Sequence, residues 1–435
     1  MRYAPLIAAL LLAALFAPRA ALAQNAPSSV IRPAVERSDP YTPHLPARAY
    51  AYHRANRILV FVGIAWRLAG FLLLLGMGIS ARLRNAAERF WWRLRSGAPP
   101  GEERRRRPRA PAFVATAAYY LLYSVYWLVW SLPVGLADLA VERRFGFSDE
   151  TLQLYLKDDL IGLCRGWVMI PVIWVGYRIY LRWPRAWWLV LSALLVPISL
   201  FVTVVYPVVI SPLYNHYTPL PAGPLRSELQ ALAARAGIRN ATVLVEDTSL
   251  RTSHVNAYVT GIGPSARIVL NDTALQELPR DQILAMVGHE MGHYAERHVL
   301  ISAAAGAVGT AIILWLLARL LPPLAERCGR RFRLRGLSDL AALPLIFLAI
   351  YLVGLAGEPV SSALSRTLEH RADAYGLRLT GLDDATARLM VGFAERDLTD
   401  PDPPPLLHLW FGTHPTLKER IAFARSFRPG PAARR

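Results

Sequence analysis

The sequence predicts a mainly α-helical protein that crosses a membrane several times. Hydrophobic residues make up 54% of its 435 residues, charged residues only 18%, and the mean hydropathy is +0.28. A single soluble domain of this length would be more polar. Six apolar runs are each long enough to cross about 30 Å of hydrocarbon as a helix. They lie near residues 58–80, 113–137, 160–181, 187–210, 299–321 and 340–364.

The N-terminus has the pattern of a signal peptide. Arg2 precedes an apolar stretch, and Ala21-Leu22-Ala23 forms a small-x-small cleavage site before Gln24. We therefore expect residues 1–23 to be a signal peptide and residues 24–57 an extracytoplasmic linker. The alternative is an uncleaved first span, although the apolar stretch is short for the roughly 20 residues that a span needs.

The arginines predict the topology. The formal charge of +18 comes from 49 Lys and Arg against 31 Asp and Glu, and it gathers in the loops 81–111, 182–185 and 327–335. These loops alternate along the chain, so the positive-inside rule places them in the cytoplasm. Residues 211–298 and the C-terminus then face the periplasm, and we expect a multi-pass protein of a bacterial inner membrane. Charge clustered beside spans predicts no nucleic-acid partner.

Two segments outside the spans are long enough to fold by themselves. Segment 211–298 predicts a small α/β unit with helices at 225–236 and 281–298 and strands at 241–246, 256–260 and 266–270. The tail predicts two helices, 369–380 and 383–397, and then a Pro-rich link at 401–405.

The most specific motif is His289-Glu290-Met291-Gly292-His293, which matches H-E-x-x-H. On a helix the two histidines lie about one turn apart on one face and can ligate one Zn²⁺. Glu290 lies beside them, where its carboxylate can take a proton from water as a general base. The bare motif also arises by chance, but its place just before a predicted span strengthens it.

A catalytic zinc site of this type needs a third protein ligand and leaves a fourth position open. The metzincin pattern would continue with Gly and His, but positions 296 and 299 hold Glu and Val. Directly after the last span, Glu369 and Asp373 are four residues apart and share one helical face. Glu369 can bind zinc and Asp373 can hydrogen-bond a ligand histidine. The alternative is an ordinary solvated helix with alternating charges.

These motifs resemble the membrane-embedded zinc metalloproteases of the CAAX prenyl endopeptidase 1 type, which are of the gluzincin type. Six stretches match in the family order. They are Val141–Ser148, Ile210–Leu220, Ser253–Tyr258, His289–His298, Ser365–Asp373 and Thr413–Arg420. Together they span nearly everything from residue 112 to residue 425.

The resemblance implies a role for each matching residue. It implies that His289, His293 and Glu369 bind one Zn²⁺ and that Glu290 is the general base. It implies that Asn256, Ala257 and Tyr258 form the strand edge along which an extended peptide lies. It further implies that His414 and Arg420 steady the oxyanion of the tetrahedral intermediate. Family members enclose a large chamber between their helices, and Arg67 is expected to face such a chamber.

Two features depart from the family pattern. The family usually has Asn shortly before the Ser-Arg pair, where this chain has Ser362. Eukaryotic members have a further first span and a cytosolic site, whereas the arginines here place the site in the periplasm. We therefore expect peptide hydrolysis without a prenylated CAAX substrate.

The expected organisation is a polytopic α-helical membrane protein with a gluzincin-type zinc metalloprotease domain that contains a small β-sheet. Residues 58–210 would supply four spans and 299–364 two more. Residues 211–298 and 365–425 would form the protease domain, and 426–435 a tail. The expected function is zinc-dependent hydrolysis of peptide bonds in a protein or peptide substrate at the lipid bilayer. The alternative is a zinc-stabilised membrane scaffold or chaperone, and nothing indicates the oligomeric state.

Overall fold

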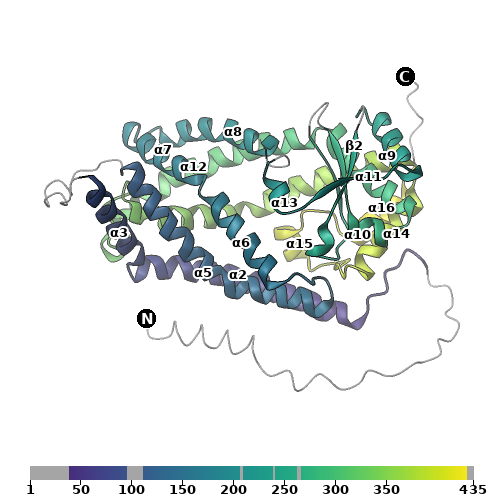
Figure 1. The fold of residues 1–435 in the computed structure, drawn as a ribbon, viewed down its shortest axis with the longest axis horizontal. Coiled ribbons are helices and arrows are strands. Elements are labelled where there is room, and N and C mark those ends of the chain that lie inside the picture. The colour runs from purple at the N-terminus through teal and green to yellow at the C-terminus, as the bar shows by residue number, and fades with distance from the viewer. Residues whose placement is uncertain (1–38, 96–110, 206–208, 239–240, 262–265, 429–435) are drawn as a thin grey trace, which may run out of the picture.

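The molecule consists of a bundle of long helices and a smaller α/β part, which lies at one end of the bundle (Figure 1). The computed structural model describes residues 39–95, 111–205, 209–238, 241–261 and 266–428. The predicted signal peptide lies outside these residues.

Five helical segments in the described part of the chain are long and apolar enough to cross a membrane. The N-terminal three are α2 (Ala47–Gly76), α5 (Phe113–Phe145), and the pair α6 (Leu152–Gly166) and α7 (Met169–Arg182). The other two are α12 (His298–Phe332) and α13 (Leu343–Thr380, preceded by a 3₁₀ turn at Leu340–Ala342). The remaining predicted run forms the apolar helix α8 (Trp187–Val205). Helix α3 (Ile79–Arg95) begins the basic loop.

Helix α13 joins the membrane part to the α/β part. The sequence predicts a span ending near residue 364 and a separate helix from residue 369, but both belong to this one helix. No strong helix-breaking residue follows Pro359 until Gly381, whose positive φ of 68° ends the helix. A single rigid rod therefore carries the end of the span and the predicted zinc ligand Glu369.

The α/β part contains a four-stranded sheet in the order β1-β2-β4-β3. Strands β2 (Thr242–Glu246) and β4 (Arg267–Asn271) are parallel, and β3 (Ala257–Thr260) pairs antiparallel with β4 at one edge. These three strands confirm the sequence prediction. Strand β1 (Tyr217–Pro219), antiparallel to β2 at the other edge, was not predicted, because three residues ending in proline have no strand periodicity.

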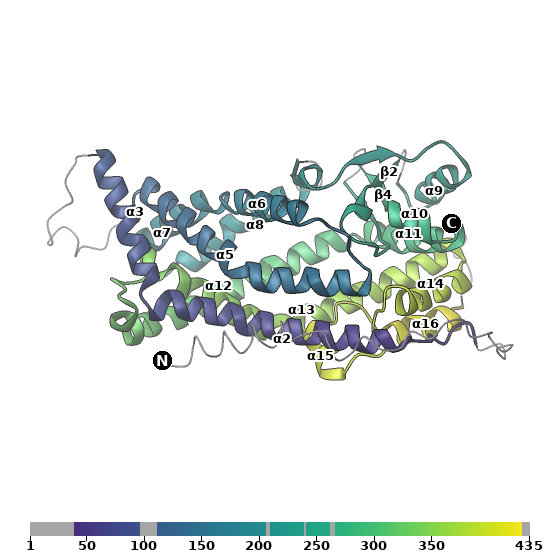
Figure 2. The ribbon, with the colours of Figure 1, turned by 60° about the horizontal axis from the view of Figure 1, so that its bottom comes forward.

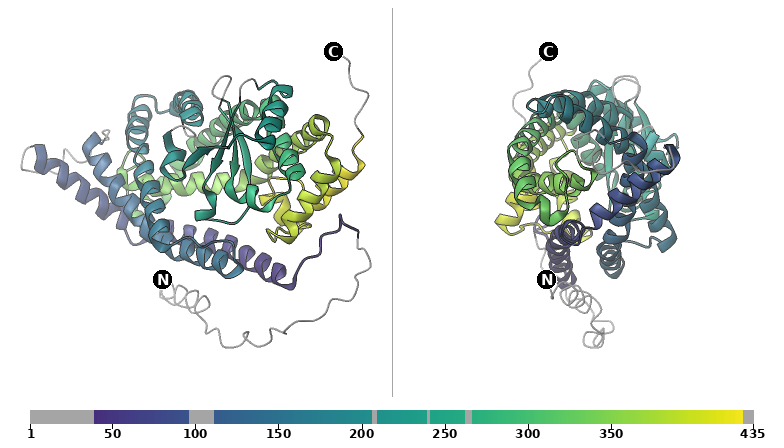
Figure 3. Two further views of the ribbon diagram at one scale, coloured as in Figure 1. Left: turned by 45° about the vertical axis from the view of Figure 1, so that its right-hand side comes forward. Right: turned by 90° about the vertical axis from the view of Figure 1, so that its left-hand side faces the viewer.

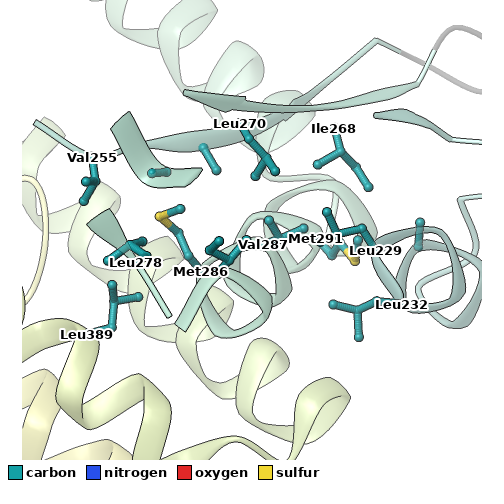
Figure 4. Packing of buried hydrophobic residues seen from close by; sticks show 14 of the residues in the cluster. Leu229, Leu232, Val255, Ile268, Leu270, Leu278, Met286, Val287, Met291 and Leu389 are labelled. Carbon is teal, nitrogen blue, oxygen red and sulfur yellow. The ribbon is translucent and has the colours of Figure 1, made fainter. Parts of the chain in front are cut away.

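Further helices complete this part of the molecule. They are α9 (Pro224–Arg235), α10 (Asp272–Glu277), α11 (Arg280–Ala295), α14 (Asp383–Glu395), α15 (Pro405–Phe411) and α16 (Leu417–Ser426). Val287 and Met291 of α11 face Ile268 and Leu270 of β4 in a buried apolar core (Figure 4). Figures 2 and 3 show the sheet and the C-terminal helices at the same end of the molecule, next to the end of α13. The core thus fixes α11 between the sheet and α13.

Candidate metal centre and active site

Helix α11 presents the H-E-x-x-H motif, and its own sequence explains where it begins and which face it buries. It starts directly after Pro279, and Asp281 lies in its first turn, where a negative charge complements the helix dipole. Ile283, Val287 and Met291 recur every four residues and pack into the apolar core. The histidines are consequently directed away from the sheet core, toward α13.

Small residues let α11 and α13 approach closely. A Cβ atom added at Gly376 would lie 2.9 Å from the backbone nitrogen of His289, and one added at Gly292 would lie 3.0 Å from the Cα atom of Ala372. Side chains at these positions would therefore force the two helices apart. The glycines are what bring Glu369 of α13 within reach of both histidines.

Three side chains converge on one point. Nε2 of His289 and Nε2 of His293 are 3.1 Å apart. The carboxylate oxygens of Glu369 lie 3.2 Å from the first of these nitrogens and 3.5 Å from the second. All three residues can offer one ligand atom within 4.8 Å of one another.

This donor set fits a metal ion well. Two ligand atoms at about 2.0–2.1 Å from a tetrahedral zinc ion lie about 3.4 Å apart, close to the separations found here. Oε2 of Glu369 is buried and makes no hydrogen bond, which is costly unless a cation satisfies it. Two imidazoles and one carboxylate are also the ligands of a catalytic zinc site with an open position. The arrangement can therefore hold a metal and a reacting water.

The outer nitrogen of each histidine also has a partner. His289 donates its Nδ1–H to Oδ1 of Asp373 at 2.8 Å, and Nδ1 of His293 lies 3.1 Å from Nδ1 of His298. Arg420 donates Nε–H and Nη2–H to the two oxygens of Asp373 at 2.9 and 2.6 Å. Such partners fix the ring orientation and leave Nε2 free for a metal.

Arg420 therefore lies behind His289, with its guanidinium held by Asp373. Nη2 of Arg420 lies 3.5 Å from Nδ1 of His289. The resemblance implies a contact with the oxyanion, which stays a prediction for this residue. The hydrogen bonds of Arg420 keep the Asp373 carboxylate ionised and in place.

Glu290 and His414 lie beside the three converging groups. Oε1 of Glu290 is 4.0 Å from Nε2 of His289, and Nε2 of His414 is 3.3 Å from Oε2 of Glu369. Burial raises the pKa of the Glu290 carboxyl above its ordinary value, while the imidazoles of His289 and His293 act against this rise. A raised carboxyl pKa suits a group that accepts and returns a proton near neutral pH.

The predicted substrate strand lies at the edge of the sheet. Strand β3 contains Ala257 and Tyr258, pairs with β4 on one side only within the described strands, and packs next to α11. Asn256 precedes it, is exposed, and accepts a hydrogen bond from Asn271 through its carbonyl. An edge strand beside the catalytic helix can accept an extended peptide.

A cavity of about 890 Å³ opens between α2, α5, α6 and α13. Arg67 lines it, with its guanidinium 5.3 Å from the ring centre of Tyr351. A charged side chain within a span is costly unless it faces a polar interior. The position of Arg67 agrees with the expectation that it faces a chamber.

His298 also contacts the site, although it lies outside the H-E-x-x-H motif. On a continuous helix, its five-residue spacing from His293 would turn it away from the face that carries the two motif histidines. The backbone instead turns at Arg297, whose φ is +56°, and this turn brings His298 back against His293. Spacing by itself does not reveal such a change of direction.

A multi-pass helical bundle with two histidines and a carboxylate converging beside an edge strand defines the class of a membrane metallopeptidase. Comparisons with known proteins agree. Residues 219–428 match the model of peptidase family M48, and residues 30–216 match that of the CAAX prenyl protease N-terminal region with five membrane helices.

Similar proteins cover most of the chain. The metalloprotease YhfN of Bacillus subtilis is 32% identical over 88% of this chain and 86% of its own length. CAAX prenyl protease 1 of Saccharomyces cerevisiae is 29% identical over 69% of this chain and 70% of its own length. The crystal structure of S. mikatae Ste24p has the same fold, with a TM-score of 0.74, 23% identity and coverage of 87% and 88% of the two chains.

The chain belongs to peptidase family M48 and is a multi-pass membrane metalloendopeptidase that acts on peptide bonds. This membership implies a metal cofactor and a protein or peptide substrate. It does not favour the alternative of a scaffold or chaperone without proteolytic activity.

Proposed function

We propose that this protein is a zinc-dependent endopeptidase whose metal is held by His289, His293 and Glu369. The convergence of these three side chains, with Glu290 next to them, carries the proposal. When bound there, zinc would polarise the scissile carbonyl and acidify water.

The chain's own residues supply the remaining chemistry. Glu290 takes a proton from the attacking water and passes it to the leaving amine, since its carboxylate lies beside the three converging groups. His414, 3.3 Å from Glu369, donates a hydrogen bond to the oxyanion, and Arg420 supports the site from behind through Asp373. Asn256, Ala257 and Tyr258 hold an extended peptide along the edge of β3.

The test compares the wild-type protein in detergent with Glu290→Gln. We expect both to contain about one zinc per chain, and the variant to cleave an unstructured reporter peptide at least about 100-fold more slowly, because general acid–base catalysis contributes that much or more. Glu277→Gln, an exposed change just before α11, serves as the matched control and should keep full activity. Peptide cleavage by Glu290→Gln at the wild-type rate would contradict the assignment of Glu290 as the general base.

We further propose that the site faces the periplasm from an inner membrane. The basic loops at 81–111, 182–185 and 327–335 support this orientation through the positive-inside rule. Compartment reporters fused near residue 100 and at the C-terminus should read cytoplasm and periplasm, respectively. A cytoplasmic C-terminus would contradict this orientation. The site would then face the cytosol, and the substrate would be a cytosolic protein or peptide.

A further inference from the structure

Helix α15 is a short helix that leaves most of its apolar side chains uncovered. Leu406 is 77% exposed, Leu409 46%, Phe411 38% and Trp410 37%. Leu406, Leu409 and Trp410 follow the i, i+3, i+4 spacing and so share one face. Soluble surfaces rarely gather large apolar side chains in this way, and such a patch marks an interaction site.

Hydrogen bonds hold α15 on the membrane-spanning helix α13. Trp410 donates its Nε1–H to the carbonyl of Leu355 at 2.8 Å, and its own carbonyl accepts a hydrogen bond from Ser362 at 3.0 Å. Arg366 donates to the carbonyls of His408 and Gly412 at 3.2 and 2.6 Å. These contacts place α15 at the level where the predicted span of α13 ends. Figure 2 shows α15 at the outer edge of the molecule, where the long helices meet the α/β part.

At the same level along α13, another face of that helix also exposes an apolar side chain. Val360 is 77% exposed and lies between Leu355 and Ser362 along the helix. It follows Tyr351 by nine residues, about half a turn around a helix with 3.6 residues per turn, so it points away from the cavity that Tyr351 lines. On a helix that spans a bilayer, a face directed away from the interior meets lipid.

The polar boundary of this surface lies next to α15. Lys418 donates to Asp402 at 2.8 Å, and both side chains are largely exposed. Asp402 precedes α15 by three residues, and Lys418 lies in the first turn of α16. A charged rim beside an apolar helix is the arrangement of an element that lies in a membrane interface.

We propose that α15 lies in the interfacial layer of the bilayer, on the side that holds the metal site, with Leu406 and Leu409 among the acyl chains. The attachment of α15 to residues 355–366 of α13, the level at which Val360 faces away from the cavity, selects lipid as the occupant. Trp410 is also of the residue type enriched at the membrane interface. His414 follows α15 by three residues and lies 3.3 Å from Glu369, so the lipid-anchored helix places this side of the site at the membrane surface.

The test measures the depth of α15 in nanodiscs that hold one copy of the full chain. Cys164→Ser and Cys328→Ser remove the two native cysteines, and a nitroxide is attached to Leu406→Cys or, separately, to Leu409→Cys. Collisions of the nitroxide with oxygen, which concentrates in lipid, are compared with collisions with a water-soluble nickel chelate. Val129→Cys, 62% exposed in α5, is the lipid reference, and Lys418→Cys is the water reference.

We expect the labels at positions 406 and 409 to resemble the one at 129, with high oxygen and low nickel accessibility. Nickel accessibility at 406 equal to that at 418, without substrate, would overturn the proposal. That outcome would assign the apolar face to a peptide or to a second copy of the chain. Metal content, measured in parallel, shows that each labelled variant has kept its folded site.

Discussion

At the scale of single residues, the proposed metal site depends on the groups behind His289 and His293 as much as on the proposed ligands. Asp373 and His298 each contact the outer nitrogen of one histidine, so both rings are turned with Nε2 toward Glu369. Asp373 is 5% exposed and Arg420 9%, so their pair is shielded from water. A buried pair of this kind is costly to break, because the partner that is left keeps an uncompensated charge.

Asp373→Asn should weaken metal binding without removing a ligand. It takes away the negative charge that accepts the hydrogen bond of His289 and pairs with Arg420, and changes in such outer partners typically lower metal affinity about 10–100-fold. Competition with a chelator would measure the zinc dissociation constant. Asp402→Asn, which breaks only the exposed pair with Lys418, is the matched control and should leave the affinity unchanged. Equal affinities in the two variants would contradict the role given to Asp373.

At the scale of elements, the site is a product of one helix crossing. The H-E-x-x-H helix α11 and the rod α13 meet through Gly292, Gly376 and Ala372, with no side chain between their backbones at these points. The sequence allows each motif to be predicted on a helix, because each has its own spacing. It does not reveal that these glycines set the distance between the helices, since a glycine in a helix pattern carries no signal about its neighbour.

Gly376→Ala tests this crossing. Alanine is the better helix former, so on propensity alone the change should stabilise the helix by about 1 kcal/mol. Its Cβ atom would, however, lie 2.9–3.0 Å from backbone atoms of His289, and we expect a net loss of about 1–3 kcal/mol together with a lower metal content. Thermal unfolding and metal analysis would report both effects.

The matched control is Gly357→Ala, in the same helix. A Cβ atom there meets nothing within 4 Å, so only the gain in helix propensity applies. If Gly376→Ala were as stable and as metal-rich as Gly357→Ala, the helices would not depend on this contact.

At the scale of the whole molecule, a cluster around His254 ties the membrane part to the α/β part. Its ring stacks on Phe147 at 4.3 Å between centroids, and its nitrogens lie 3.5 Å from Glu142 at the end of α5 and 3.3 Å from Asp397 after α14. Burial alone would lower the pKa of His254. The hydrogen bonds to Asp397 and Glu142 outweigh it and raise the pKa to about 9.

This raised pKa predicts a pH dependence of stability. The unfolded chain has a histidine pKa of about 6.5, so the folded state binds the proton more tightly, and the resulting stabilisation is complete only below that pH. It is lost as the pH rises through about 9. Between pH 7 and pH 9.5 the unfolding temperature of His254→Gln should therefore fall less than that of the wild type.

His216→Gln is the matched control for this experiment. His216 pairs with Asp247 in a position where its side chain is 85% exposed, and such pairs contribute little. Its unfolding temperature should follow the wild type across the same pH range. Parallel curves for His254→Gln and the wild type would exclude His254 as the source of the dependence.

The sequence by itself determined the class of the fold, a mainly α-helical membrane protein with a small sheet, and it predicted the residues of the candidate site. Apolar run length, strand alternation and the H-E-x-x-H spacing are local signals, and each reports a structure formed by neighbouring residues. The sequence predicts His289, Glu290, His293 and Glu369 as site residues, and the structure brings the two histidines and Glu369 together. The strands predicted at 241–246, 256–260 and 266–270 are also present.

Only the tertiary structure decided how these pieces meet. It joined the last span and the Glu369 helix into one rod, turned His298 against His293 and held Arg420 on Asp373. It also laid α15 against α13 at the end of the span. These are contacts between residues that are distant in sequence or separated by a backbone turn. Side-chain packing and the few hydrogen-bond partners available to buried polar groups determine these contacts. No periodic pattern in the sequence predicts them.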